Sequence, residues 1–172
     1  MQFDVIIGNP PYLELREVEY EPKGFTCFET KAIHAMCMER GAALLHPKGC
    51  MSMIVPLALP STQRMEVVQD ILERSRSAWY ANFAWRPGKL FDTVNRALTI
   101  FVVIPVSEGH TFSTAYQKWT SDDRVGLFER VRYVEVPRQR PACWIPKLRE
   151  PIERAILEKC LNVKTPLGRF TS

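Results

Sequence analysis

Four consecutive residues near the start of the chain combine hydrogen-bond acceptors, a rigid backbone and a flat ring: Asn9, Pro10, Pro11 and Tyr12. The side-chain oxygen of Asn9 and the carbonyl of Pro10 are two acceptors that together can take both hydrogens of one amino group. Consecutive prolines fix φ at two positions, so the carbonyl is held in place before a ligand arrives. Tyr12 offers an aromatic face for stacking. These properties make the tetrapeptide a candidate ligand site.

The segments around this tetrapeptide predict a parallel sheet. Residues 3–8 form a continuous apolar, β-branched run, which is typical of a fully buried parallel strand, and the tetrapeptide follows its carboxyl end. Open α/β sheets bind ligands at that end of their strands. Apolar residues at helical spacing predict a helix over 28–46, stopped at 47–49, and a second buried strand follows over 50–55.

The remaining elements complete an α/β pattern. Ser61 or Thr62 is expected to cap a helix that carries Val67, Val68, Ile71 and Leu72 on one face. Strands are expected at 79–85 and 98–104, and shorter ones at 112–119 and 131–136 around a helical turn at 122–129. A last helix is expected at 151–161, where Pro151 suits a first turn. We expect an α/β fold: part of a doubly wound, Rossmann-like sheet over residues 1–111 that ends in an antiparallel hairpin, and a small basic extension over 112–172.

Composition narrows the class of protein. The 172 residues are 46% hydrophobic and can bury a core, and they contain no apolar run long enough for a membrane span, so a cytoplasmic protein is expected. Five cysteines without a CxxC pair argue against disulfides and against a metal site. Lys and Arg number 11 against 12 acidic residues in 1–111, but 12 against 7 in 112–172. The basic excess of the second part weakly favours a polyanionic partner.

The strand followed by Asn9-Pro10-Pro11-Tyr12 resembles the catalytic motif of the gamma-class adenine-specific DNA methyltransferases, as found in type IIG restriction-modification enzymes. The resemblance extends over nearly the whole chain. Residues 49–56 are similar to the family's second strand, and 86–91 with 98–103 are similar to its late aromatic motif and strand. Trp119, Leu127, Phe128 and 145–147 fall where the family places such residues.

The resemblance implies transfer of a methyl group from S-adenosylmethionine to the exocyclic amine of adenine in double-stranded DNA, without a metal. Asn9 and the Pro10 carbonyl would accept hydrogen bonds from that amine and make its lone pair more nucleophilic. Tyr12 and Phe91 would stack on an adenine flipped out of the duplex. A track of basic residues would follow the DNA backbone: Arg130, Arg132, Arg138, Arg140, Lys147 and Arg149, of which all but Arg149 are the primary candidates.

The same resemblance implies that donor binding is incomplete in this chain. The family's glycine-rich loop and acidic ribose ligand precede the catalytic motif, whereas the predicted catalytic strand here starts at residue 3. Two further positions that contact the donor in the family hold Ala32 and Cys37, so Asn9 is the one cofactor-binding candidate. The chain is expected to be inactive alone and to need a partner chain or an upstream segment with the donor-binding half.

Less specific readings stay open. Asn9–Tyr12 can be a rigid turn, Phe91 a core residue, and the basic stretch a solvated surface. His34 is expected to be a packed or half-exposed residue and not a ligand or a base. At the level of function, the alternatives are a DNA-binding or specificity-type module without donor binding, and an inactive structural remnant.

Overall fold

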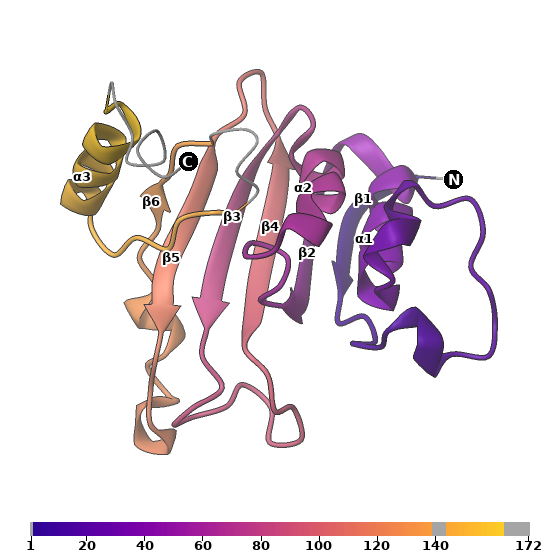
Figure 1. Cartoon of the computed structure of the whole chain (residues 1–172), viewed down its shortest axis with the longest axis horizontal. Helices are drawn as coiled ribbons and strands as arrows, with labels where there is room; N and C mark the ends of the chain where they lie inside the picture. Colours follow the sequence, from indigo (N-terminus) through magenta and orange to yellow (C-terminus); the bar gives the residue numbers. More distant parts are fainter. Residues whose placement is uncertain (1, 139–143, 164–172) are drawn as a thin grey trace, which may run out of the picture.

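The computed structural model describes residues 2–138 and 144–163, which form a mixed six-stranded sheet with helices (Figure 1). The strand order is β1-β2-β4-β3-β5-β6. The strands are β1 (Phe3–Gly8), β2 (Leu45–Pro56), β3 (Arg76–Phe83), β4 (Leu98–Pro105), β5 (Thr111–Gln117) and β6 (Val134–Glu135). The helices are α1 (Ile33–Leu44), α2 (Glu66–Glu73) and α3 (Pro151–Leu161), and short 3-10 turns occupy Leu15–Glu17, Thr26–Thr30, Gln63–Met65, Ser121–Asp123 and Phe128–Arg130. The predicted α/β fold is confirmed.

Four strands run in the same direction. β1 pairs with β2 and β3 pairs with β5 in parallel, whereas β4 lies antiparallel between β2 and β3, and β6 is antiparallel to β5. The predicted hairpin of the third and fourth strands is therefore confirmed. The carboxyl ends of β1, β2, β3 and β5 meet at one edge of the sheet, at the bottom of Figure 1. We call this the carboxyl edge.

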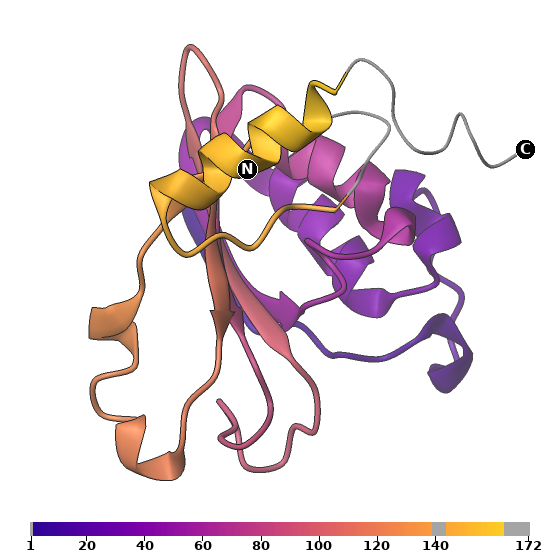
Figure 2. The same cartoon turned by 60° about the vertical axis from the view of Figure 1, so that its left-hand side comes forward.

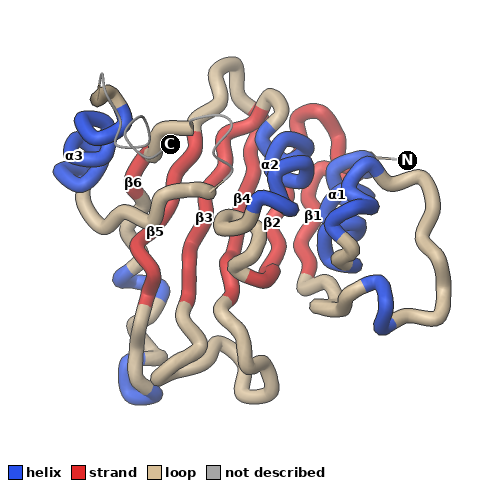
Figure 3. Tube along the Cα trace, viewed as in Figure 1, coloured by secondary structure: helices blue, strands red, loops and turns tan. Residues whose placement is uncertain are grey.

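Helices α1 and α2 pack side by side on one face of the sheet (Figure 2). The core beneath them contains Met51, Val55, Tyr80, Phe101 and Val103, all at most 1% exposed. Among the described residues no α-helix covers the opposite face, and Figure 3 shows loops with short helical turns beside β5 near the carboxyl edge. The described residues also contain no helix with the length and apolarity that a membrane crossing requires.

Strand β1 corrects one expectation, because it is an edge strand and not fully buried. Val5 is 56% and Ile7 is 80% exposed. A continuous apolar run predicts burial on both faces, but the run does not reveal whether a neighbouring strand lies on each side. Among the described strands, β1 has a neighbour, β2, on one side only.

The connection from α1 to β2 also differs from expectation. The helix begins at Ile33, after a separate 3-10 turn, and the strand begins directly at Leu45 and runs through Pro47, Lys48 and Gly49. A register shift opposite Phe3 to Val5 accommodates these residues in the strand. A Cβ at Gly49 would lie 2.8 Å from the carbonyl of Asp4, so the glycine permits a close backbone approach and does not act as a helix stop.

The start of α2 follows a 3-10 turn whose N-cap is Thr62, but the expected side-chain cap is absent. The Thr62 hydroxyl instead donates to the carbonyl of Ala58 at 2.9 Å. The predicted apolar face is present in part, because Val68 and Leu72 are fully buried.

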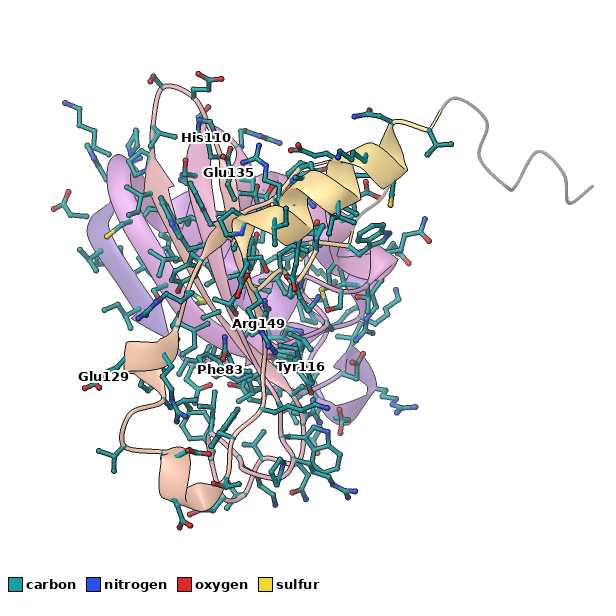
Figure 4. The ribbon with its side chains drawn as sticks, turned by 90° about the vertical axis from the view of Figure 1, so that its left-hand side faces the viewer. Phe83, His110, Tyr116, Glu129, Glu135 and Arg149 are labelled. Atoms are coloured by element: carbon teal, nitrogen blue, oxygen red, sulfur yellow. The ribbon has the colours of Figure 1, made fainter. Side chains whose placement is uncertain are left out.

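The chain after β6 returns across α2. The N–H of Ile145 donates to the carbonyl of Pro60 at 2.8 Å, and the Ile145 side chain is 1% exposed within the core. Helix α3 has the predicted bounds. Glu135 of β6 accepts a hydrogen bond from Arg154 of α3, and its carboxylate lies 2.7 Å from Nδ1 of His110 (Figure 4). The last part of the described chain is therefore attached to both the core and the sheet.

Candidate functional site

Asn9 and Tyr12 lie at the carboxyl edge, directly after β1. The Tyr12 hydroxyl donates to Asn9 Oδ1 at 2.6 Å and lies 3.1 Å from the carbonyl oxygen of Ile54 near the end of β2. This contact fixes the side-chain oxygen of Asn9, and not its NH₂ group, toward the tyrosine. A carbonyl oxygen has two lone pairs, so Asn9 Oδ1 retains one acceptor position. Asn9 is solvent-exposed, which leaves that position accessible.

Arg96 contacts both the backbone and the ring of Tyr12. Its Nη1 donates to the Tyr12 carbonyl at 3.2 Å, and its guanidinium carbon lies 6.0 Å from the ring centroid. Burial raises the pKa of Tyr12 to about 12, because desolvation outweighs the opposing charge of Arg96. The tyrosine is therefore a neutral hydrogen-bond donor at neutral pH.

His34 supports Tyr12 from inside the fold. Their rings meet edge to face with centroids 6.5 Å apart, and His34 is 2% exposed. Neither ring nitrogen of His34 has a hydrogen-bond partner among the described residues. Burial lowers the pKa of His34 to about 4, with the nearby Glu14 opposing the shift and Arg64 and Arg96 adding to it. His34 is therefore a packed, neutral residue at neutral pH, and the sequence carried no signal that it would lie beneath Tyr12.

Phe91 lines a small cavity of about 210 Å³ that shares Ile54 with the Tyr12 contact. The loop that carries Phe91 is fixed at Gly88, whose N–H donates to the carbonyl of Trp119 at 2.8 Å. A Cβ on Gly88 would lie 2.5 Å from Trp119 Nε1, so only glycine allows this approach. Tyr12 and Phe91 are thus both near Ile54, and Phe91 is half-buried, as either a stacking or a packing residue would be.

The predicted basic track is divided in the structure. Arg130, Arg132, Lys147 and Arg149 line one cavity at the carboxyl end of β5, together with Lys118 and Tyr116, which the sequence did not single out. Arg138 is elsewhere: its guanidinium pairs with Glu73 at 3.0 Å and donates to Gln69 at 2.7 Å on α2. Arg140 lies outside the described residues.

The two predicted donor-contact positions, Ala32 and Cys37, differ in exposure. Ala32 is fully buried, whereas Cys37 lines a largely apolar cavity of about 700 Å³ between α1, β1 and residues 20–25. Exposed side chains of β1 form one wall of it, among them Phe3, Val5 and Ile7. Among the described residues, no group of three metal-ligating side chains lies close enough together to hold an ion.

Comparisons with known proteins give one family match and several structural matches. Residues 1–85 match the family model of the Eco57I restriction-modification methylase, and no curated protein sequence gives a significant match. The DrdV–DNA complex matches with a TM-score of 0.62 and 11% identity over 79% of this chain and 17% of that one. The type ISP restriction-modification enzyme LlaGI, in complex with a DNA substrate mimic, gives 0.61 and 11% identity over 81% and 18%. The ATP-dependent type ISP enzyme LlaBIII, bound to DNA, gives 0.58 and 13% identity over 87% and 13%.

At these identities the structural matches show the fold alone, and this chain spans less than a fifth of each matched protein. The matched family segment contains β1, the Asn9–Tyr12 tetrapeptide, α1 and β2, all of which position the candidate site. In residues 1–85 the chain is therefore similar to the Eco57I restriction-modification methylases, and its sheet has a fold shared with restriction-modification enzymes.

Proposed function

We propose that this chain is the catalytic-motif half of a site-specific DNA methyltransferase that acts on the exocyclic amine of adenine. The observation that supports this most directly is the fixed, exposed Asn9 Oδ1 at the carboxyl edge, with one lone pair taken by Tyr12 and one available. It lies within the segment that matches a restriction-modification methylase family.

The residues suit chemistry on a weakly nucleophilic amine. The lone pair of the adenine amine is delocalised into the ring, and hydrogen bonds accepted from its two hydrogens localise it. Asn9 Oδ1 and the Pro10 carbonyl supply acceptors whose orientation is set before the base arrives, so little reorganisation remains for the transition state. Phe91 and the ring of Tyr12, which share Ile54, supply apolar surface for the flipped base.

The described residues do not fit the methyl donor. Recognition of S-adenosylmethionine needs a backbone cradle where a strand turns into a helix, and an acidic partner for the ribose. None of the described glycines lies at the N-terminus of a helix that directly follows a strand. We therefore propose that a second polypeptide segment supplies donor binding and packs against the exposed edge of β1 and the cavity beside it.

Donor binding is therefore expected to depend on that second segment. In isothermal titration calorimetry, the 172-residue chain alone should give no heat with S-adenosylmethionine at micromolar concentration. A mixture with a separately expressed donor-binding half, such as the glycine-rich part of an Eco57I-type enzyme, should bind it. Micromolar binding by the isolated chain would contradict this part of the proposal.

The proposed chemistry is tested by Asn9→Ala in the completed enzyme. Loss of one preorganised polar contact costs roughly 3 kcal/mol or more, so methylation should fall at least about a hundredfold. DNA affinity should change little, because Asn9 acts on the electronics of the amine. A variant with more than half of the wild-type turnover would reject the assignment, and DNA binding without methylation by the wild-type complex would favour the DNA-binding module instead.

A further inference from the structure

A cavity of about 790 Å³ lies beside the carboxyl end of β5, at the far side of the sheet from Asn9. Strand β6 pairs only with Phe112 and Ser113, so Ala115 to Gln117 have no strand partner on that side among the described residues. Residues 130–132 and 147–153 form the other walls. Figure 4 views this side of the molecule, with Tyr116 and Arg149 labelled.

Five cations line this cavity: Lys118, Arg130, Arg132, Lys147 and Arg149. Two acidic residues also line it, but both are engaged at the start of α3. Glu153 accepts hydrogen bonds from the backbone N–H groups of Arg149 and Glu150, and the Glu150 side chain accepts the N–H of Glu153 in the same capping box. The carboxylates of Glu150 and Glu153 therefore accept backbone N–H groups at the start of α3. Among the described residues, neither carboxylate forms an ion pair with a cation of the cavity.

Most of the cations have no carboxylate partner. Only Arg130 forms an ion pair, with Asp123 at 3.2 Å, and no ion pair joins Lys118, Arg132, Lys147 or Arg149 to any acidic residue in the part of the chain that the structure describes. Arg132 donates to the carbonyls of Glu129 and Val131, and Lys147 Nζ donates to the carbonyl of Ile145 at 3.3 Å. Burial lowers the pKa of Lys147, so its ammonium is held in a partly desolvated position without a compensating charge. An anion in the cavity would supply that charge.

We propose that this cavity binds a phosphate of the DNA backbone at a fixed distance from the target adenine. The proposal rests on the function proposed above. β1 and β5 run in the same direction, so Asn9 and the cavity lie at the same edge of the sheet. Four inter-strand spacings separate the two strands, and at about 4.8 Å each they place the cavity about 19 Å from the tetrapeptide. Phosphates of one strand follow each other at about 3.4 Å along the helix axis, so the contacted phosphate lies roughly five or six nucleotides from the flipped base.

The salt dependence of DNA binding tests the contact, because each phosphate that a protein neutralises adds about 0.9 to the slope of log K against log salt concentration. The variant Lys147→Gln/Arg149→Gln should reduce that slope by about 1 to 2 for a labelled duplex and the full chain. Lys48→Gln/Lys159→Gln removes the same charge at exposed positions outside the cavity and should leave the slope unchanged.

Duplexes in which one phosphate at a time is replaced by a neutral methylphosphonate link then locate the contacted phosphate. A link placed roughly five or six nucleotides from the target adenine should weaken binding of the wild-type chain and leave binding of the cavity variant unchanged. Equal slopes for the two double variants, or no link position that distinguishes wild type from the cavity variant, would overturn the proposal. So would failure of the wild-type chain to bind duplex DNA at low salt. The Asn9→Ala assay is independent of these outcomes, so the cavity can fail while the proposed methylation stands.

Discussion

Tyr12 has two tasks at the proposed site, and its hydrogen bond with Asn9 serves one of them. The hydroxyl orients the Asn9 amide, whereas the ring of Tyr12 supplies apolar surface beside Ile54. Because one side chain carries both functions, a single alanine substitution removes both together. Separate substitutions are needed to distinguish orientation of the amide from stacking of the base.

Tyr12→Ala and Phe91→Ala are expected to weaken binding of a duplex with a flipped or mismatched target base, each by about 1–3 kcal/mol if the rings stack. Fluorescence of 2-aminopurine at the target position reports the flipped state directly. If Phe91→Ala leaves the fluorescence unchanged and lowers only the thermal stability, then Phe91 is a packing residue of the loop.

Tyr12→Phe is the matched control, because it keeps the ring and removes the hydroxyl. The 2-aminopurine signal should then stay near the wild-type value. Loss of one hydrogen bond of about 0.5–1.5 kcal/mol should lower kcat of the completed enzyme by roughly two- to tenfold. A kcat equal to that of the wild type would show that Asn9 needs no orientation by Tyr12.

Helix α1 carries a histidine whose burial makes stability depend on pH. The pKa of His34 falls from 6.5 to about 4 in the folded chain, so between these values the unfolded chain binds more protons. The free energy of unfolding should therefore decrease as pH falls from 6.5 to 4, with His34 contributing about 3 kcal/mol of the loss. Urea unfolding at a series of pH values measures this.

Two substitutions separate titration of His34 from its packing. His34→Leu and His34→Gln both remove the titrating group, but Gln keeps buried polar atoms and should be the less stable of the two at pH 7. Both variants should show a flatter pH dependence than the wild type over pH 4 to 6.5. A slope as steep as that of the wild type in both variants would exclude His34 as its source.

At the scale of elements, the sequence predicted what depends on local patterns. The apolar run at 3–8 and the proline at the start of 151–161 identified β1 and α3 with their observed bounds. Local patterns did not reveal that β2 extends back through Pro47 and Gly49, because the close approach to Asp4 involves residues distant in the sequence. The edge position of β1 was likewise a property of the whole sheet.

At the scale of the molecule, the sequence indicated the tetrapeptide but not its surroundings. Asn9 and Tyr12 are recognisable because they are contiguous. Their neighbours Arg96 and His34 come from a distant loop and from helix α1. Arg138 lies apart from the other predicted basic residues because it forms an ion pair with Glu73 on α2. Sequence proximity alone could not predict either outcome.

The exposed edge of β1 predicts association. Ile7→Lys places a charge on a strand that is 80% exposed at this position and has a neighbour on one side only. It should reduce self-association in sedimentation equilibrium and prevent assembly with a donor-binding half, while changing the free energy of unfolding by less than about 0.5 kcal/mol. Val125→Lys is the control, because Val125 is 97% exposed away from this edge. Equal effects of both variants would assign association to general hydrophobicity.

The contacts of Arg138 with α2 and of Ile145 with Pro60 bear on how the chain is made. Ile145 fills a place in the core, and its N–H donates to the carbonyl of Pro60, which lies 85 positions earlier in the sequence. During synthesis, β1 to β4 and both core helices leave the ribosome long before Ile145 does. Part of the core of the nascent sheet therefore stays open, and its apolar surface is available to chaperones until Ile145 has emerged.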